Sequence, residues 1–325
     1  EGYSRLYSFT LSAPWDITTA LYDNKWAITN SAQSNCIYFK DSTTAFVTSY
    51  SKRLVHKIKF LTPWNISSLY SDSCFYFMDL AQVYSFNFKP DGRKLYILDR
   101  NNNGVVQYRL DKPWDISSAH KEDCFSYNIK TLSVPAFNSM TFSKDGTHLY
   151  ITYDYSTYKL VLQFNLSLPW EVSTAAYISQ YSVSAQSSYS RGGIAFNNDG
   201  TKMYLSGYED KIIKEYNLAS PWILATASYA DKFFSFSAQF NNVSDFYVSK
   251  DGKKLYVLNY STKAVYQYIL TAPWDITTAV YSNKNFYVGN QENYPFSMSF
   301  KPDGTKLYIS GNTNREIFQY SIKKD

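Results

Sequence analysis

Side chains that could do acid–base or nucleophilic chemistry are few and scattered in this sequence. The chain has three histidines, His56, His120 and His148, and they fall at three different positions of the repeat described below. Catalytic triads and histidine-rich metal centres need such side chains close together, so neither is predicted here.

The carboxylates leave one catalytic alternative open. Five of them lie in or beside loops that differ between repeats: Asp79, Asp154, Asp210, Asp245 and Glu292. Two carboxyl groups roughly 5–9 Å apart could hydrolyse a glycosidic bond. Spacing along the chain does not place any two of them at that distance, so a glycan-active hydrolase or lyase remains an alternative.

The cysteines predict neither a disulfide scaffold nor a zinc site. Cys36, Cys74 and Cys124 are odd in number and show no C-x-x-C spacing. We expect free, half-buried thiols. Cys74 and Cys124 each follow a repeated Trp by ten residues, which leaves open a bridge between neighbouring repeats.

One segment superficially resembles a sialidase Asp-box. Residues 143–147 read Ser-Lys-Asp-Gly-Thr, but the Asp-Gly spacing differs from that motif, and the pair recurs along the chain. We interpret it as a hairpin turn, in which Gly supplies a positive φ. Residues 99–104 offer oxygen ligands but lack the distal Glu of a calcium loop. No metal site and no cofactor are predicted.

A repeat of about fifty residues organises these side chains. Six Pro-Trp pairs mark it, with successive spacings of 49, 50, 56, 52 and 52 residues; the tryptophans are Trp15, Trp64, Trp114, Trp170, Trp222 and Trp274. Residues 85–127 illustrate one unit: a short alternating strand, an Asp-Gly turn, a second and a third strand, the Pro-Trp connector, and a fourth strand. Aromatic and β-branched residues favour such strands, and Pro ends a strand by removing a ladder donor.

Repeats of this length and strand content predict a β-propeller, since each four-stranded blade buries its faces against neighbouring blades. We therefore predict an all-β fold: a single propeller spanning residues 1–325, with six four-stranded blades. Seven blades are less favoured. We expect the outer strand after Trp15 to complete the blade begun by residues 296–322, so that the ring closes by strand exchange between the termini. Residues 7–11 are then left over as a surplus third-type strand.

These motifs resemble known propeller repeats. The Asp-Gly-x-Lys-Leu-Tyr hairpin is similar to the YVTN, NHL and lactonase-like repeats. The segment 266–279, Tyr-Gln-Tyr-x-Leu-x-x-Pro-Trp-Asp-Ile-x-x-Ala, resembles an uncharacterised repeat of phage-derived and bacterial surface-associated sequences. The resemblance implies the fold, and a virion-associated, cell-surface or otherwise extracellular setting. It is uninformative about function, because one fold hosts many.

Charge and hydropathy exclude two classes of partner. The 32 basic and 27 acidic residues are spread along the chain without a long run of one sign, so nucleic-acid binding is not predicted. No stretch reaches the ~18 apolar residues of a membrane span, so membrane insertion is not predicted either.

Loops that differ between repeats are the best place for recognition. They carry polar and aromatic side chains that suit a protein or glycan surface: Gln82, Tyr84, Arg100, Asn102, Asn138, Tyr153, Tyr155, Tyr189, Arg191, Tyr208, Asn242, Tyr260, Gln291 and Tyr294. We therefore predict a non-catalytic binding, structural or assembly module, which could also form a homo-oligomer. The alternative is an enzyme, either glycan-active or a metal-dependent lactonase-like hydrolase.

Overall fold

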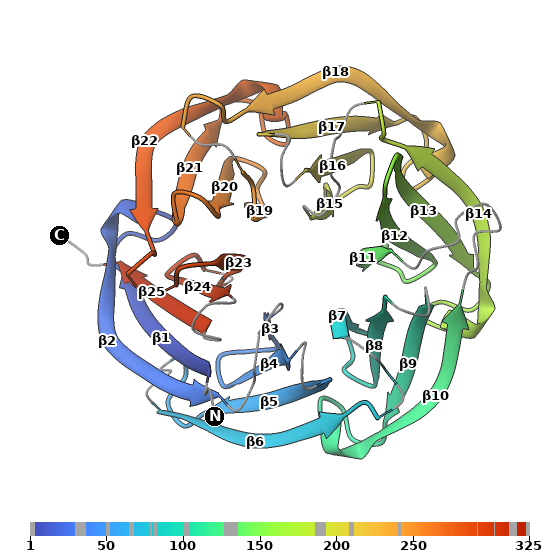
Figure 1. The fold of residues 1–325 in the computed structure, drawn as a ribbon, viewed down its shortest axis with the longest axis horizontal. Coiled ribbons are helices and arrows are strands. Elements are labelled where there is room, and N and C mark those ends of the chain that lie inside the picture. The colour runs from blue at the N-terminus through green and yellow to red at the C-terminus, as the bar shows by residue number, and fades with distance from the viewer. Residues whose placement is uncertain are drawn as a thin grey trace. The chain divides into compact units, whose positions relative to one another are not determined.

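The computed structural model confirms an all-β propeller fold, in which β-strands are joined by tight turns and short 3-10 helices (Figure 1). It describes residues 4–29, 37–49, 53–64, 68–78, 80, 83–100, 104–126, 136–185, 193–207, 211–239, 242–290, 292–301, 303–311 and 317–322.

The chain divides into two compact units. The first comprises residues 1–79, 244–271 and 279–325, and the second comprises residues 80–243 and 272–278. Each unit is described by itself below. A single domain over residues 1–325 stays a prediction.

The second unit contains three antiparallel four-stranded sheets, each in chain order from the first to the fourth strand. The first sheet is β7 (Val83–Phe88), β8 (Lys94–Asp99), β9 (Gly104–Leu110) and β10 (Ala119–Ser126). The second is β11 (Phe137–Phe142), β12 (His148–Tyr155), β13 (Tyr158–Leu166) and β14 (Ala175–Ser182). The third is β15 (Ile194–Phe196), β16 (Lys202–Ser206), β17 (Ile212–Leu218) and β18 (Ala227–Ser235). Helices η3 (Ile116–Ser118), η4 (Val172–Thr174), η5 (Leu224–Thr226) and η6 (Ile276–Thr278) also lie in this unit.

The first unit contains two further sheets of the same kind. One is β3 (Ile37–Phe39), β4 (Thr44–Ser49), β5 (Leu54–Phe60) and β6 (Leu69–Tyr76). The other is β19 (Asp245–Val248), β20 (Lys254–Asn259), β21 (Ala264–Leu270) and β22 (Ala279–Tyr287).

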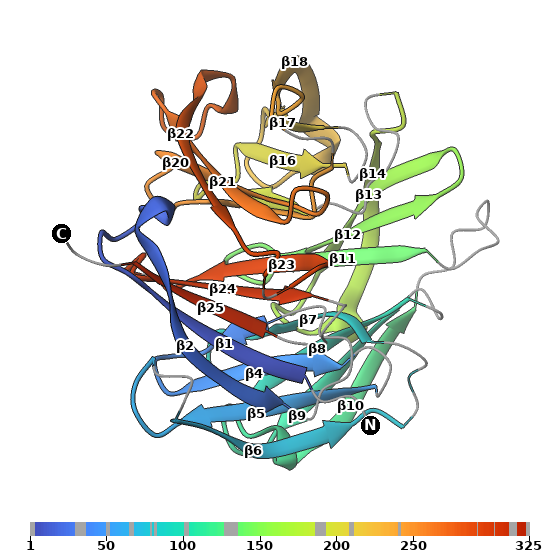
Figure 2. The same cartoon turned by 60° about the vertical axis from the view of Figure 1, so that its left-hand side comes forward.

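The remaining sheet joins both ends of the chain and has five strands: β1 (Ser4–Leu11), β2 (Ala20–Thr29), β23 (Pro295–Phe300), β24 (Lys306–Gly311) and β25 (Ile317–Ile322). Helix η1 (Ile17–Thr19) connects β1 to β2. Strand β1 pairs antiparallel with β2 and parallel with β25, and Figure 2 shows the blue N-terminal strands beside the red C-terminal ones.

This sheet corrects the prediction of six four-stranded blades. Five sheets are regular four-stranded blades, and the sixth differs because the surplus strand β1 is part of it. Strand β2 meets β25 through two residue pairs, Ala20 with Ile322 and Leu21 with Ser321. Because β1 takes up most of the pairing with β2, closure by a simple exchange of fourth strands is not shown.

Four of the repeated tryptophans pack against the glycine of an Asp-Gly turn: Trp15 on Gly304, Trp114 on Gly92, Trp170 on Gly146 and Trp222 on Gly200. The repeat of Trp64 has Ser42 in place of that glycine, and the Trp64 N–H donates to the Ser42 carbonyl. All six tryptophans have a positive φ, between 58° and 66°. In the second sheet of the second unit, the Trp170 N–H donates to the Gly146 carbonyl (2.9 Å), and a Cβ on Gly146 would lie 2.1 Å from the indole Nε1. Gly is therefore required at this turn both for its φ of +75° and for the close approach of the ring.

Two further hydrogen bonds fasten the connectors that contain Trp15, Trp170, Trp222 and Trp274 to the preceding sheet. In the second unit, the Tyr204 hydroxyl of β16 donates to the Trp274 carbonyl (2.6 Å), while Glu215 of β17 accepts from the Ile276 N–H (3.2 Å). Equivalent bonds run from Tyr96 and Gln107 to the connector that contains Trp170. These bonds satisfy connector backbone groups that would otherwise be buried without a partner.

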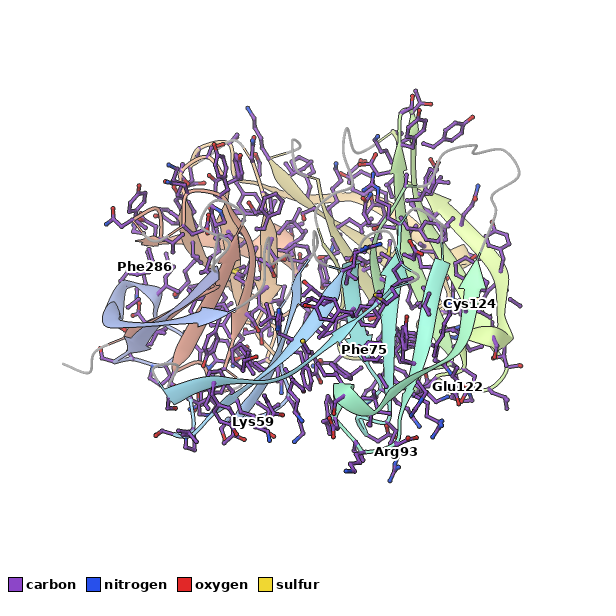
Figure 3. All side chains as sticks on the ribbon, turned by 60° about the horizontal axis from the view of Figure 1, so that its bottom comes forward. Lys59, Phe75, Arg93, Glu122, Cys124 and Phe286 are labelled. Carbon is purple, nitrogen blue, oxygen red and sulfur yellow. The ribbon has the colours of Figure 1, made fainter. Side chains whose placement is uncertain are left out.

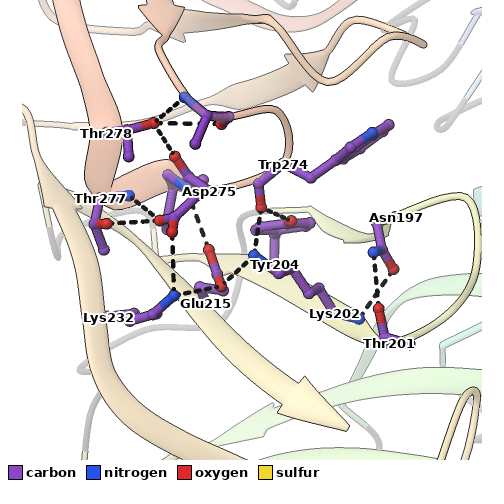
Figure 4. Close-up of polar contacts among 12 residues, drawn as sticks. Asn197, Thr201, Lys202, Tyr204, Glu215, Lys232, Trp274, Asp275, Thr277 and Thr278 are labelled. Atoms are coloured by element: carbon purple, nitrogen blue, oxygen red, sulfur yellow. Dashed lines mark hydrogen bonds and ion pairs between the residues drawn. The ribbon is translucent and has the colours of Figure 1, made fainter.

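Glu215 stands where β5 carries Lys57 and four other sister strands carry a glutamine: Gln107, Gln163, Gln267 and Gln319. Its buried carboxylate is compensated by Lys202 at 2.8 Å and Lys232 at 3.5 Å (Figure 4). Lys232 also bonds Asp275, whose proximity raises the pKa of that lysine. The charge introduced by Glu215 is therefore matched locally, as a buried ion must be.

Candidate functional site

The strongest candidate site lies in the first unit, where β19 and β23 begin. Asp245 is the first residue of β19, and its carboxyl group accepts three hydrogen bonds. The donors are the Met298 N–H (2.9 Å) and the Ser297 hydroxyl (3.2 Å), both on β23, and the Phe246 N–H (2.8 Å). The side chain thus bridges the first strands of two neighbouring sheets.

Asp245 departs from the repeat. Counted back from the Asp-Gly turn, the same position holds Ser85, Ser139, Gly193 and Ser297. A neutral small residue is therefore enough for the fold, and a carboxyl group here needs another explanation.

Burial raises the pKa of Asp245 to about 6, from its usual 3.8, although the three hydrogen bonds act in the opposite direction. Each of those bonds comes from a neutral group and so favours the charged form less than a cation would. The residue is partly buried and partly open to solvent. A carboxyl group with a pKa near neutrality can exchange protons with a substrate or a water molecule.

Three aromatic residues lie on or next to the strands that surround Asp245. Phe296 directly precedes Ser297, at a β-bulge between β23 and β24, and is 39% exposed. Tyr260 follows β20, whose residue Leu258 pairs with Asp245. The Tyr260 ring lies 5.2 Å from that of Tyr294 and 6.2 Å from that of Phe296. The three rings, called the aromatic shelf below, offer flat apolar surface, as a ring-shaped ligand requires.

The carboxylate of Glu292 fixes the loop that carries Tyr294 of the aromatic shelf. Glu292 is fully buried, and its Oε1 accepts the Tyr294 N–H at 2.7 Å. Its own N–H donates to the Val288 carbonyl (2.9 Å). Glu292 therefore has a structural task, and so has Asp154 of β12, which pairs with Lys159 in the second unit.

The structure brings together two groups of the residues predicted from the variable loops. Tyr260 and Tyr294 join in the aromatic shelf. In the second unit Arg100 donates to the Asn138 Oδ1, and the Tyr153 phenol, whose pKa burial raises, lies near Arg100, with Tyr155 exposed beyond it.

The other predicted residues are not brought into either group. Asn242 is partly buried in the second unit, and Tyr84 lies in β7, with its side chain outside the described part. Six positions lie outside the described residues: Gln82, Asn102, Tyr189, Arg191, Tyr208 and Gln291. Asp79, Asp210 and Cys36 lie outside them as well. Recognition by this whole set stays a prediction.

Two predictions about single residues can be compared with the described chain. Cys74 is a free thiol, as expected. Both Cys74 and Cys124 are exposed and not half-buried; Figure 3 labels Cys124 on β10. Asp145 serves the hairpin turn, as predicted, because its Oδ1 accepts from the hydroxyls of Ser143 and Thr147 and from the Thr147 N–H.

The described residues include neither a metal-ligand cluster nor a membrane-spanning helix. Among them, no three His, Cys, Asp or Glu side chains are grouped as a metal site would require. None of the described helices is long and apolar enough to cross a membrane.

Comparison with known proteins identifies the kind of fold. No protein-family model and no curated protein sequence matches the chain. Among solved structures, the periplasmic gluconolactonase PpgL of Pseudomonas aeruginosa matches with a TM-score of 0.61 at 14% identity, over 100% of this chain and 97% of that one. The chain shares the fold of lactonase-like β-propellers.

Two further structures give similar matches. A candidate 6-phosphogluconolactonase of Bacteroides fragilis has a TM-score of 0.58 at 12% identity, covering 96% of this chain and 88% of its own. A Lactobacillus plantarum protein has a TM-score of 0.62 at 10% identity, covering 99% and 97%. At such identities the likeness shows the fold alone.

These neighbours overturn the prediction of a non-catalytic binding or assembly module. The neighbours with named activities are lactonases, which agrees better with the enzymatic alternative. The sequence has no clustered catalytic motif, and Asp245 is a single carboxylate in a position that is otherwise Ser or Gly.

Proposed function

We propose that this protein is a lactonase-like hydrolase in which Asp245 acts as the general base. The observation that carries the proposal is the buried, repeat-breaking carboxyl group with a pKa of about 6. The likeness in fold to a gluconolactonase supports a six-membered sugar lactone as the substrate class.

The reaction uses groups that the site supplies. The Asp245 Oδ1 accepts one hydrogen bond from the Phe246 N–H and keeps a second lone pair for a water molecule. As that water attacks the lactone carbonyl carbon, its proton passes to the carboxylate. The ring C–O bond then breaks, and the protonated carboxyl group returns the proton to the leaving ring oxygen. Lactone and water become one hydroxy acid.

The aromatic shelf would hold the substrate. The C–H face of a sugar ring packs well on tyrosine and phenylalanine rings, and Tyr294 and Phe296 are 44% and 39% exposed. Ser297 and the Met298 N–H keep the carboxyl group oriented through the Oδ2 atom.

The test is hydrolysis of glucono-δ-lactone by the purified full chain, followed as acid release against the spontaneous rate. We expect catalysis by the natural protein, an acidic limb near pH 6 in its pH profile, and a loss of about 10²–10⁴-fold in Asp245→Asn. Asp251→Asn, in the turn after β19, is the matched control and should retain activity. Catalysis that survives in Asp245→Asn would refute the assignment of the base, and a natural protein inactive on sugar lactones would refute the function.

Two finer expectations accompany this proposal. We propose that the five-stranded sheet of β1, β2 and β23–β25 completes a six-bladed propeller, because it holds strands from both termini. Deletion of residues 1–12 should then cost stability far beyond the loss of a free tail. We also propose an extracytoplasmic location, in line with the periplasmic neighbour, which fractionation of the source cells would test.

A further inference from the structure

Strand β14 forms an edge of its sheet. It pairs with β13 and is the last strand in the order β11-β12-β13-β14. A strand in this position presents backbone N–H and C=O groups on its open side, which invites pairing with another strand.

The other fourth strands carry charges that discourage such pairing. Strands β6, β10, β18 and β22 contain Asp72, the run from His120 to Asp123, the Asp231–Lys232 pair and Lys284. Strand β14 reads Ala-Ala-Tyr-Ile-Ser-Gln-Tyr-Ser and has no charged residue. Strand β14 therefore lacks the charged side chains that discourage edge-to-edge pairing in the other four strands.

Its exposed side chains are also apolar. Ile178 lies at the β-bulge, between Tyr177, which pairs with Phe164, and Ser179, which pairs with Gln163. It is 48% exposed, and Tyr177 is 39% exposed. At the same bulge β10 carries Glu122, which bonds Gln107. The bulge is common to the fourth strands, so what sets β14 apart is the aliphatic residue placed there.

A third apolar side chain extends this surface. Leu168, in the connector before η4, is 58% exposed, and its N–H donates to Thr174, directly before β14. Leu168 thus lies next to the start of the uncharged strand β14. The open side of this strand, with Tyr177 and Ile178, is called the β14 edge below.

We propose that the β14 edge is the contact through which two copies of this chain form a dimer. In a two-fold interface each residue patch meets its own copy. A charged strand would bring like charges together there, whereas β14 meets itself without that cost. The open backbone groups supply hydrogen bonds, and Tyr177 and Ile178 supply apolar surface that the partner copy covers.

The test measures mass by sedimentation velocity over a wide concentration range for three proteins: the natural chain, Ile178→Lys and Val280→Lys. Val280 is 58% exposed on β22, so its replacement is an equally drastic change on a different fourth strand. We expect dimers for the natural chain and for Val280→Lys, and monomers for Ile178→Lys, which should fold normally because the side chain is exposed.

Three results would overturn the proposal: a natural chain that stays monomeric at every concentration, an Ile178→Lys variant that still dimerises, or equal disruption by Val280→Lys. Hydrogen exchange adds a local readout. Amides of residues 179–182 should exchange more slowly as the natural chain is concentrated, and this protection should be lost in Ile178→Lys.

Discussion

Replacing Asp245 by Asn should make the protein more resistant to unfolding as the pH rises. The folded state holds the pKa of this carboxyl group at about 6, against 3.8 in an unfolded chain. The folded state therefore binds the proton more tightly. Its advantage is fully present below pH 3.8 and is lost as the pH rises through 6.

The size of the effect follows from that shift. About two pKa units correspond to about 3 kcal/mol lost by the natural protein at high pH, most of it between pH 4 and 7. Asn cannot ionise and escapes this loss. It also gives up one acceptor for a backbone N–H, which costs about 1 kcal/mol at every pH. The change with pH is therefore the diagnostic quantity.

Urea unfolding at a series of pH values measures it. The stability of Asp245→Asn relative to the natural protein should rise by about 2 kcal/mol between pH 4 and 7. Asp251→Asn is the control, because hydrogen bonds from Ser249 and Lys253 lower the pKa of that residue, so its variant should lose relative stability with rising pH. A difference between Asp245→Asn and the natural protein that does not vary with pH would refute the reasoning. If Asp245→Asn is more stable near neutral pH and also loses activity, the loss of activity is not caused by unfolding.

Two further substitutions test the repeat itself. Gly146→Ala should lower the unfolding free energy by several kcal/mol, because the new Cβ would lie 2.1 Å from the Trp170 ring and the residue would keep a φ of +75°. Thermal melting measures this loss, and a loss below about 1 kcal/mol would contradict the prediction. Glu215→Ala should lower the unfolding free energy by about 3–5 kcal/mol, because it leaves Lys202 and Lys232 without their shared carboxylate. Glu215→Gln should lower it much less, since Gln also accepts from the Ile276 N–H. Equal losses of stability in urea unfolding would refute this role.

The sequence predicted the elements of the fold because each has a local cause. The Asp-Gly turn needs a positive φ, and the alternation of the strands and the Pro-Trp connectors recur at fixed spacing. The pairing of β1 with β25 could not be predicted, because β1 has the same residue pattern as any third strand. Its partner is also distant in sequence: Leu6 pairs with Ile317, 311 residues later. The bonds from Tyr204 and Glu215 to the next connector are likewise invisible before the sheets are stacked.

The candidate site was predictable in part. Tyr260 and Tyr294 were selected because they differ between repeats, and the structure places their rings together. Asp245 was noticed merely as one of five loop carboxylates. Aligning the repeats at the Asp-Gly turn would have distinguished it, since its counterparts are Ser or Gly. What alignment could not supply is the environment that raises its pKa.

Glu215 and Asp245 both depart from the residues that most repeats carry at their positions, and their surroundings assign them different roles. Glu215 stands in place of a Gln, and Lys202 and Lys232 compensate its charge. It still accepts the Ile276 N–H of the connector, so it stabilises the fold through the same hydrogen bond as its Gln counterparts. Asp245 replaces a Ser or Gly, and its hydrogen bonds come from neutral donors, so burial dominates and the proton is held near neutral pH. Burial without a compensating cation favours the protonated form of Asp245. A carboxyl group with a pKa near neutrality is suited to the general-base role that we propose for it.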